Sequence, residues 1–213
     1  MSRINEPIDR EVLDQLEKCS TSAIADTKHE GVKTLSSAIK PVHTDCTFVG
    51  TVRTVTLDPS TLWAPVQTLD AALEDEVVVV DADDSVDEAI WGELLSTSAT
   101  ATGVRGMVTN GAVRDVAGIR DIGFPVFSRA VTPRGPSGNE EAEQNVQVTV
   151  GDTPINPGDV LVGDESGVVV IERDAVAEVV SDAETVVKTE RDVTRLLDEG
   201  KSLGQAFEDA GMV

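Results

Sequence analysis

Arg114 and Asp115 form a charged pair directly after an apolar segment that should be buried. The pair stands between "GMVTN", which predicts a buried strand, and "DVAGIRDIG", which predicts a short helix closed by Gly123. Asp115 could cap that helix while Arg114 serves as a surface ion-pair partner. Alternatively, the arginine could neutralise a substrate oxyanion while the carboxylate holds a hard divalent cation. The pair alone leaves both interpretations open.

The segment "WGELL" is a second candidate for chemistry. A glycine inside a helix costs about 1 kcal/mol relative to alanine, so Gly92 indicates either close backbone packing or a helix that begins there. In the second case, four N–H groups lack intrahelical partners and suit a carboxylate or another anion. These are the N–H groups of Gly92, Glu93, Leu94 and Leu95. The alternative is an earlier start with Ser85 and Glu88 as a capping box, and the spacing alone favours it.

The order of elements places both candidates at one edge of a sheet. Three buried strands are predicted in "EVVVVD", "GMVTNG" and "FPVFS", and helices are predicted in the "SVDEAIWGELLSTSATATG" and "DVAGIRDIG" segments between them. Strands that alternate with helices imply parallel pairing. In an open parallel sheet, ligands bind in the loops at the carboxyl ends of the strands. Both candidates fall in such loops.

The flanking segments complete an α/β organisation. Two N-terminal helices are predicted in "IDREVLDQLEKCS" and "TSAIADTKHEG", the second ending at Gly31, followed by the strand "TFVGTVRTVTL" and the helix "TLWAPVQTLDAAL". "VQVTVGDTPINPGDVLVGDESGVVVIE" predicts three antiparallel strands separated by the turns "NPGD" and "DESG". A long helix is expected from about Asp174 to Gly200. Because no linker interrupts the chain, we expect one domain over residues 1–213.

The composition excludes several classes of protein. The net charge is −22, from 39 acidic and 17 basic residues spread along the chain, which disfavours nucleic-acid binding. This acidity is either a solubility device or an adaptation to a salt-rich cytoplasm, and we hypothesise the second. Two cysteines give no disulfide framework, and no secretory signal or membrane-length apolar run is seen. We therefore expect a soluble cytoplasmic protein.

A family resemblance covers most of the chain. "WGELLSTSATATGVRGMVTNGAVRDVAGIRDIGFPVFSRAVTPRG" resembles the signature region of the family that joins 4-hydroxy-4-methyl-2-oxoglutarate aldolase to the regulator of ribonuclease activity A (RraA). "SAIADT" resembles its N-terminal helix, and "PGDVLVGDESGVVVIERDAVAEVV" resembles its C-terminal hairpin and helix. The resemblance implies a swivelling β/β/α-type domain with a central mixed sheet and a long C-terminal helix. It also implies assembly as a homotrimer or homohexamer.

The resemblance also implies roles for individual residues. In the aldolase branch, an acidic residue, commonly Asp, precedes an Arg-Asp pair by twenty intervening positions, and here Glu93 stands at that place. The backbone N–H groups of residues 92–95 match the family's pyruvate contacts, and Arg114 and Asp115 match the pair directly. Asp115 would hold Mg²⁺ or Mn²⁺. Glu190 is the best match to a glutamate that reaches a neighbouring subunit's metal site, although a solvated charged helix face is the alternative.

These matches imply a metal-dependent lyase that cleaves a 4-hydroxy-2-oxoacid to pyruvate and also decarboxylates oxaloacetate, since both reactions leave the same enolate. The alternative is a binding protein that regulates a ribonuclease or another partner by contact. Asp115 argues for the enzyme, because regulator-type members often lack that residue, whereas Glu93 mildly favours the regulator. A methyltransferase is disfavoured, because no Gly-x-Gly-x-Gly loop follows a first strand.

Overall fold

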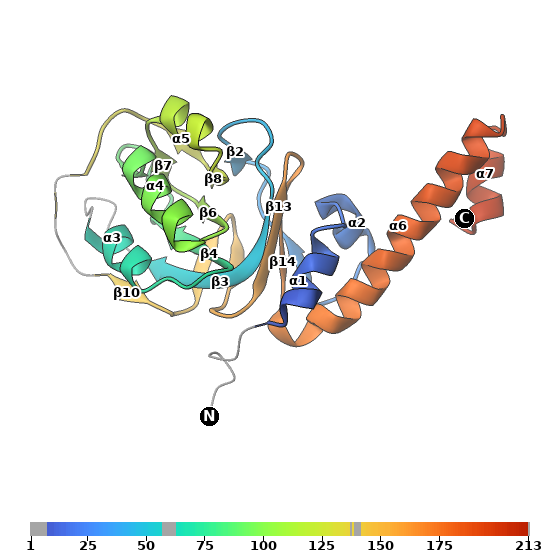
Figure 1. Ribbon diagram of the computed structural model, residues 1–213, viewed down its shortest axis with the longest axis horizontal. Helices are drawn as coiled ribbons and strands as arrows, with labels where there is room; N and C mark the ends of the chain where they lie inside the picture. The colour runs from blue at the N-terminus through green and yellow to red at the C-terminus, as the bar shows by residue number, and fades with distance from the viewer. Residues whose placement is uncertain (1–7, 57–62, 137, 139–141, 213) are drawn as a thin grey trace.

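The computed structural model describes residues 8–56, 63–136, 138 and 142–212 (Figure 1). The helices are α1 Arg10–Leu16, α2 Thr21–Asp26, α3 Trp63–Asp70, α4 Glu93–Thr102, α5 Val116–Ile122, α6 Val176–Asp198 and α7 Leu203–Ala210, with a 3₁₀ turn, η2, at Arg173–Ala175. The long strands are β3 Phe48–Thr56, β4 Glu76–Asp81, β6 Gly106–Thr109, β13 Val160–Asp164 and β14 Gly167–Ile171. The short strands are β1 Val32–Thr34, β2 Lys40–Pro41, β5 Ala89–Trp91, β7 Ala112–Val113, β8 Val126–Ser128, β9 Ala130–Val131, β10 Glu143–Gln144, β11 Val148–Val150 and β12 Thr153–Ile155.

A mixed nine-stranded sheet forms the centre of the described structure. Its order is β1-β14-β13-β3-β4-β6-β8-β2, with β10 paired to β3. The pairs β3·β4, β4·β6 and β6·β8 are parallel, whereas β13 and β14 join the sheet antiparallel. The predicted parallel centre and antiparallel last third are thus both confirmed. A small parallel sheet, β5-β7-β9, lies beyond the carboxyl end of β6.

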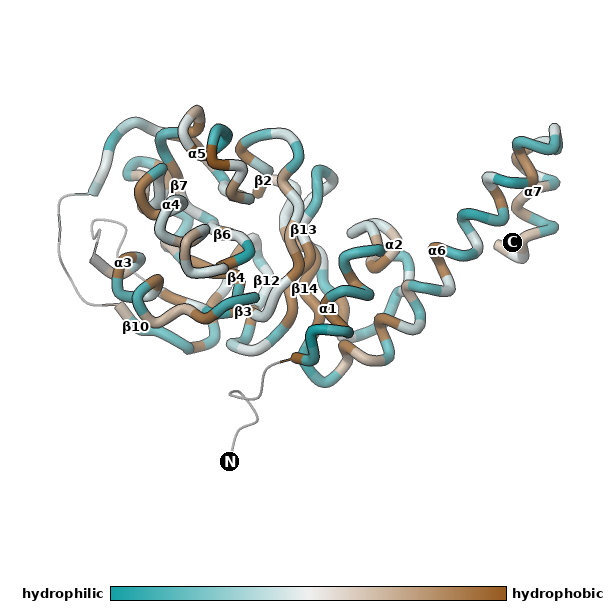
Figure 2. The backbone as a smooth tube through the Cα atoms, in the orientation of Figure 1, coloured by the Kyte–Doolittle hydropathy of each residue, from teal (hydrophilic) through white to brown (hydrophobic). Residues whose placement is uncertain are grey.

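The valine run of β4 shows why the sheet is covered on both faces. Val77, Val78, Val79 and Val80 have no exposed surface. Because side chains alternate along a strand, Val78 and Val80 pack into one core cluster with α3, α4 and α5, while Val77 and Val79 pack into another beside the hairpin β11-β12. Figure 2 shows the hydrophobic residues gathered along these central strands.

The N-terminal helices and α6 form a separate layer over β13 and β14. Leu13 and Leu16 of α1 pack with Val179 of α6 in a third core cluster. The predicted long C-terminal helix is confirmed, and its second half leaves the body with α7 folded back against it (Figure 1). In the part of the chain that the structure describes, no helix combines the length and the apolar character that crossing a bilayer requires.

Three sequence predictions differ from the structure. The segment predicted as one helix from Ser85 contains strand β5, so Ser85 and Glu88 do not form a capping box at a helix start. The single strand predicted in "VQVTVGDTPI" is a hairpin, β11-β12. Helix α2 ends at Asp26 rather than near Gly31. Residues 57, 61 and 62, which belong to a predicted strand and a predicted helix, lie outside the described residues.

Candidate active site

Helix α4 begins directly after Gly92. Strand β5 ends at Trp91, and Gly92 continues the extended backbone (φ −164°, ψ −165°) as the N-cap of α4. Ser96 fixes this junction, because its hydroxyl donates to the Gly92 carbonyl (3.1 Å) and accepts from the Trp91 indole N–H (2.9 Å). The later helix start, which spacing alone disfavoured, is therefore the one that the structure shows.

Three backbone N–H groups at the start of α4 are free. Those of Glu93, Leu94 and Leu95 have no partner among the described residues, and no side chain caps the helix. The first intrahelical bond is donated by Ser96 to the Gly92 carbonyl. The Leu94 side chain is 82% exposed. This helix start can therefore receive an anion from solvent.

Strand β7 brings Arg114 and Asp115 to the same place. The N–H of Arg114 donates to the carbonyl of Trp91 (2.9 Å), which ties the end of β7 to the end of β5. A Cβ built on Gly92 would lie 2.7 Å from Asp115 Oδ2 and 3.1 Å from Arg114 Cγ. The pair and the start of α4 are thus in contact, and only a glycine at position 92 allows this approach.

Asp115 stands at the N-cap of α5, but its side chain does not cap the helix. Its backbone is left-handed (φ 57°, ψ 36°), and its carboxylate accepts no hydrogen bond from the described residues. Asp115 is therefore the N-cap residue by position, but it lacks the side-chain hydrogen bond of a cap. Its Oδ2 lies 3.4 Å from Arg114 Nε, and both side chains are partly exposed, at 45% and 36%. The carboxylate remains open to a further ligand.

Gly135 lies next to the guanidinium group of Arg114. A Cβ on Gly135 would lie 3.3 Å from Arg114 Cζ and closer still to Nη1, so the guanidinium lies against bare backbone. The same loop is tied to β5, because the Ala89 N–H donates to the Arg134 carbonyl (2.7 Å). Gly135 was not singled out from the sequence. The signal that could have found it is its place in "TPRGP", inside the stretch that carries the family resemblance.

The donor set suits a divalent cation of the magnesium type. Magnesium is bound in proteins through one or two carboxylates and keeps several waters. Asp115 supplies one such open carboxylate, and the described residues contain no cluster of three or more His, Cys, Asp or Glu side chains that would enclose a metal. Glu190 does not join the pair within one chain: it is exposed and belongs to the half of α6 that projects away from α4 and α5 (Figure 1).

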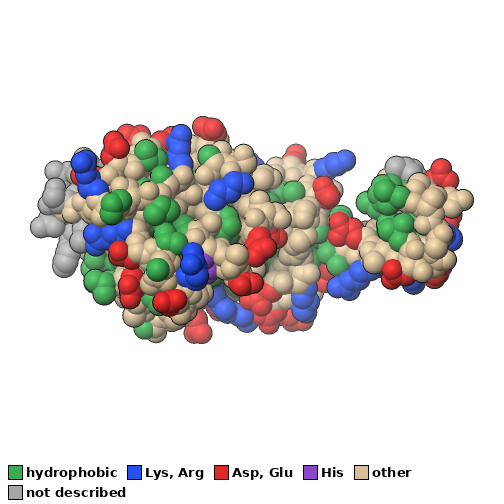
Figure 3. All heavy atoms as spheres, turned by 90° about the horizontal axis from the view of Figure 1, so that it is seen from above, with side chains coloured by type: hydrophobic (Ala, Val, Ile, Leu, Met, Phe, Trp, Pro, Cys, Tyr) green, Lys and Arg blue, Asp and Glu red, His purple; other side chains and the backbone are tan. Residues whose placement is uncertain are grey.

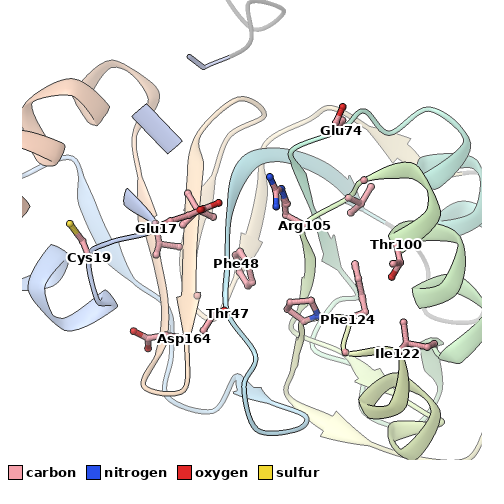
Figure 4. Close-up of a pocket in the computed structure, with 17 residues that line it drawn as sticks. Glu17, Cys19, Thr47, Phe48, Glu74, Thr100, Arg105, Ile122, Phe124 and Asp164 are labelled. Carbon is pink, nitrogen blue, oxygen red and sulfur yellow. The ribbon is translucent and has the colours of Figure 1, made fainter. Parts of the chain in front are cut away.

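A cavity of about 650 Å³ lies elsewhere, at the amino ends of the parallel strands. Figure 4 shows Phe48 between Glu17, Cys19 and Asp164 on one side and Arg105 on the other. Gly103, which follows the last residue of α4, lines this cavity. A ten-residue helix is about 15 Å long, so the cavity and the Arg114–Asp115 pair lie at opposite ends of α4.

A known protein family matches most of this chain. The sequence model of the RraA-like family, described as Aldolase/RraA, matches residues 21–170, which include both candidate segments. The chain belongs to the RraA-like family. The match also covers the sheet from β3 to all but the last residue of β14.

Two other proteins are similar to this chain in sequence. A protein of Halalkalibacterium halodurans with the provisional name 4-hydroxy-4-methyl-2-oxoglutarate aldolase is 33% identical over 157 residues, which cover 74% of each chain. Protein DlpA of Legionella pneumophila is 29% identical over 205 residues, which are 93% of this chain. The match spans only 33% of the length of DlpA.

Two solved structures share the fold. An uncharacterized protein from Pseudomonas syringae superposes with a TM-score of 0.88 at 28% identity, covering 96% of both chains. RraAS2 of Streptomyces coelicolor, described as an unusual member of the RNase ES inhibitor RraA family, has a TM-score of 0.79 at 25% identity and covers 90% of this chain and 99% of its own. The predicted α/β fold with a mixed sheet and a long C-terminal helix is thereby confirmed.

Proposed function

We propose that this RraA-like protein is a divalent-metal-dependent lyase that cleaves a 4-hydroxy-2-oxoacid, such as 4-hydroxy-4-methyl-2-oxoglutarate, to pyruvate and also decarboxylates oxaloacetate. The observation that carries the proposal is the direction of the Asp115 side chain. Its carboxylate is turned away from the helix it precedes and lies against Gly92, beside Arg114 and the free start of α4. The provisional name of the H. halodurans relative supports the same activity.

Each group has a distinct task in this proposal. The N–H groups of Glu93, Leu94 and Leu95 bind and orient the carboxylate of the pyruvyl unit. When the bond between C3 and C4 of the oxoacid breaks, its electron pair stays on C3 and forms an enolate. The C4 fragment leaves as a carbonyl compound, with its hydroxyl proton passing to solvent, or as CO2 when oxaloacetate is the substrate. The Arg114 guanidinium donates hydrogen bonds to the enolate oxygen. Protonation of the enolate carbon then gives pyruvate. No lysine is needed, because no Schiff base forms.

Asp115 is the residue that would hold Mg²⁺ or Mn²⁺, with Glu190 of the partner subunit as a second ligand in a homotrimer or homohexamer. Such a cation supplies Lewis acidity toward the oxoacid. The exposure of Leu94, Arg114 and Asp115 supports a site that a neighbouring subunit completes. Two free, buried cysteines, Cys19 and Cys46, support a reducing compartment such as the cytoplasm.

Oxaloacetate turnover tests the proposal. Pyruvate release is coupled to lactate dehydrogenase with Mg²⁺ or Mn²⁺, and the decarboxylation caused by the metal alone is subtracted. We expect activity that EDTA abolishes and that Asp115→Ala lowers at least a hundredfold (about 2.7 kcal/mol). Asp121→Ala is the matched control, because Asp121 follows Arg120 in another Arg-Asp pair of this chain and is exposed on α5. Activity that survives both EDTA and Asp115→Ala contradicts the mechanism.

A regulator of a ribonuclease is the second candidate. The similarity to RraAS2 of S. coelicolor favours it, because that protein is described as a member of an RNase inhibitor family. The same assay separates the two candidates. A protein that is inactive on oxaloacetate and on 4-hydroxy-2-oxoacids at every metal concentration would support the regulator.

A further inference from the structure

Ser96 holds the start of α4 from its carbonyl side. The backbone N–H and the hydroxyl of Ser96 both donate to the Gly92 carbonyl, each over 3.1 Å. The same hydroxyl accepts a hydrogen bond from the indole N–H of Trp91 (2.9 Å). Ser96 and Trp91 are 0% and 1% exposed, so water does not compete for these bonds. The Gly92 carbonyl therefore has two fixed donors in the protein interior.

The indole of Trp91 decides which way the Ser96 hydroxyl points. A serine hydroxyl has one hydrogen to donate and accepts through its oxygen, whereas an indole N–H can only donate. The indole therefore binds the Ser96 oxygen, and the hydroxyl hydrogen is left for the Gly92 carbonyl. Trp91 is itself fixed, because its ring stacks on Phe124 (centroids 6.2 Å apart) and its carbonyl accepts from the Arg114 N–H. The hydroxyl thus has one ordered orientation.

Gly92 needs this support because it cannot hold the helix start itself. The approach of Asp115 leaves room only for a glycine at position 92, and no side chain caps α4. Glycine also has more conformational freedom than any other residue. A capping side chain would in addition occupy N–H groups of the first turn. Support from Ser96 acts on the carbonyl and leaves those N–H groups free.

The Gly92 carbonyl and the Glu93 N–H belong to one peptide group. A peptide group is planar and trans, so its C=O and its N–H point in opposite directions. Because the carbonyl is directed at Ser96, the Glu93 N–H is directed away from the body of α4. This N–H is one of the three free donors that bind the oxoacid carboxylate in the proposed function.

We infer that Ser96 is a positioning residue for oxoacid binding, because its hydroxyl, ordered by Trp91, fixes the direction of the Glu93 N–H. The inference rests on the proposed function. Donors that are fixed before the substrate arrives bind it without a further cost of ordering. Without the hydroxyl, the Gly92 carbonyl keeps only the backbone bond from Ser96, and the buried Trp91 N–H loses its acceptor.

The kinetic test uses Ser96→Ala in the 213-residue chain with oxaloacetate and Mg²⁺. The loosened donor should raise KM roughly three- to tenfold, while kcat changes less than about threefold. Thr68→Val is the matched control, because Thr68 is also fully buried and its hydroxyl donates to the Ala64 carbonyl within α3. Its urea midpoint should fall, but its KM should stay within about twofold of wild type. A KM raised equally by both variants, or by neither, would overturn the inference.

Trp91→Phe tests whether the indole orders the hydroxyl. Phenylalanine keeps a ring to stack on Phe124 but has no indole N–H, so the Ser96 hydroxyl can turn away from Gly92. Because both variants disturb the same arrangement, the double variant should raise KM by less than the product of the two single effects. A KM equal to that product would mean that Ser96 acts independently of Trp91, which contradicts the inference.

Pyruvate binding distinguishes the positioning role from the lyase activity. Pyruvate with Mg²⁺ is the probe, and the readout is the amide resonance of Glu93 in nitrogen-15 NMR spectra. We expect the dissociation constant for Ser96→Ala to be roughly three to ten times that of wild type. A wild-type protein that binds pyruvate but does not turn over oxaloacetate would contradict the lyase and still support the positioning role if Ser96→Ala binds more weakly. Equal dissociation constants, or no pyruvate binding by the wild type, would overturn the inference.

Discussion

Two features of Asp115 bear on its role in the candidate site. Its backbone is left-handed, and its side chain does not make the capping hydrogen bond that an aspartate before a helix commonly makes. Asparagine and aspartate tolerate the left-handed region at small cost, so the conformation is accessible. In this conformation the Asp115 carboxylate lies against Gly92 and Arg114 and does not cap α5.

Gly92→Ala tests whether that direction matters. The added Cβ would lie 2.7 Å from Asp115 Oδ2, so the carboxylate must move away. Because a misplacement of about 1 Å can cost a hundredfold in rate, we expect kcat/KM for oxaloacetate to fall roughly a hundredfold. Circular dichroism and the thermal midpoint should stay close to wild type, since the φ and ψ of Gly92 suit any residue. Unchanged kinetics would show that the carboxylate position is unimportant.

The sequence predicted which residues meet, but not how their side chains lie. Arg114, Asp115 and the "GELL" segment were identified from the loop position and from the family resemblance. The direction of the Asp115 side chain depends on the approach of β5 to β7, which are each two or three residues long. The contact of Gly135 with Arg114 likewise depends on the meeting of separate segments. Local sequence patterns do not determine such distances between separate segments of the chain.

Among the elements, the N-terminal layer is tied to the sheet by Asp164, at the end of β13. Its carboxylate accepts hydrogen bonds from the Thr21 N–H (2.8 Å) and the Thr21 hydroxyl (2.7 Å) at the start of α2, and from the Ser166 N–H (2.8 Å). Burial acts to raise the pKa of Asp164, but these hydrogen bonds outweigh it, and the pKa is lowered. The charged form is therefore the one that holds α2 to the hairpin.

Asp164→Asn should destabilise the protein in a pH-dependent way. A lowered pKa in the folded state gives stability that is present above the ordinary aspartate value of about 3.9 and is lost as the pH falls through the lowered value. At pH 7 we expect a loss of about 1.5–3 kcal/mol from weakened hydrogen bonds to the charged group. Urea unfolding from pH 7 to pH 3 should show the difference from wild type narrowing below about pH 4.

Asp182→Asn is the control for this comparison, because Asp182 is exposed on α6 and its side chain makes no hydrogen bond or ion pair with the described residues. It should follow the wild-type curve at every pH. A constant difference between Asp164→Asn and wild type down to pH 3 would show that the charge of Asp164 contributes nothing.

Elements with a strong periodic pattern were predictable, whereas short ones were not. The valine run of β4 and the amphipathic α6 follow directly from spacing. The β11-β12 hairpin was missed because apolar residues alternate across its turn, although Gly151 and Asp152 both have positive φ (58° and 61°), as tight hairpin turns require. Strand β5 was missed because three apolar residues before a helix fit a helical pattern as well.

At the scale of the whole molecule, charge is the dominant feature. Figure 3 shows acidic and basic side chains distributed over the visible face, without one basic patch. The net charge of −22 must be held within a compact body, and like charges that are close repel one another more when little salt is present. Ion pairs on the surface offset only part of this repulsion, because exposed pairs contribute little each.

The thermal midpoint should therefore rise with salt. Screening shortens the Debye length from about 10 Å at 0.1 M to about 3 Å at 1 M, which removes most repulsion between exposed carboxylates. If 2–4 kcal/mol of repulsion is relieved, the midpoint should rise by roughly 5–15 °C between 0.05 M and 2 M KCl. Sucrose at the same concentrations is the control. It is excluded from the protein surface, as stabilising solutes are, but it carries no charge and cannot screen the carboxylates. A midpoint unchanged by KCl would mean that the acidic surface serves solubility rather than a salt-rich cytoplasm.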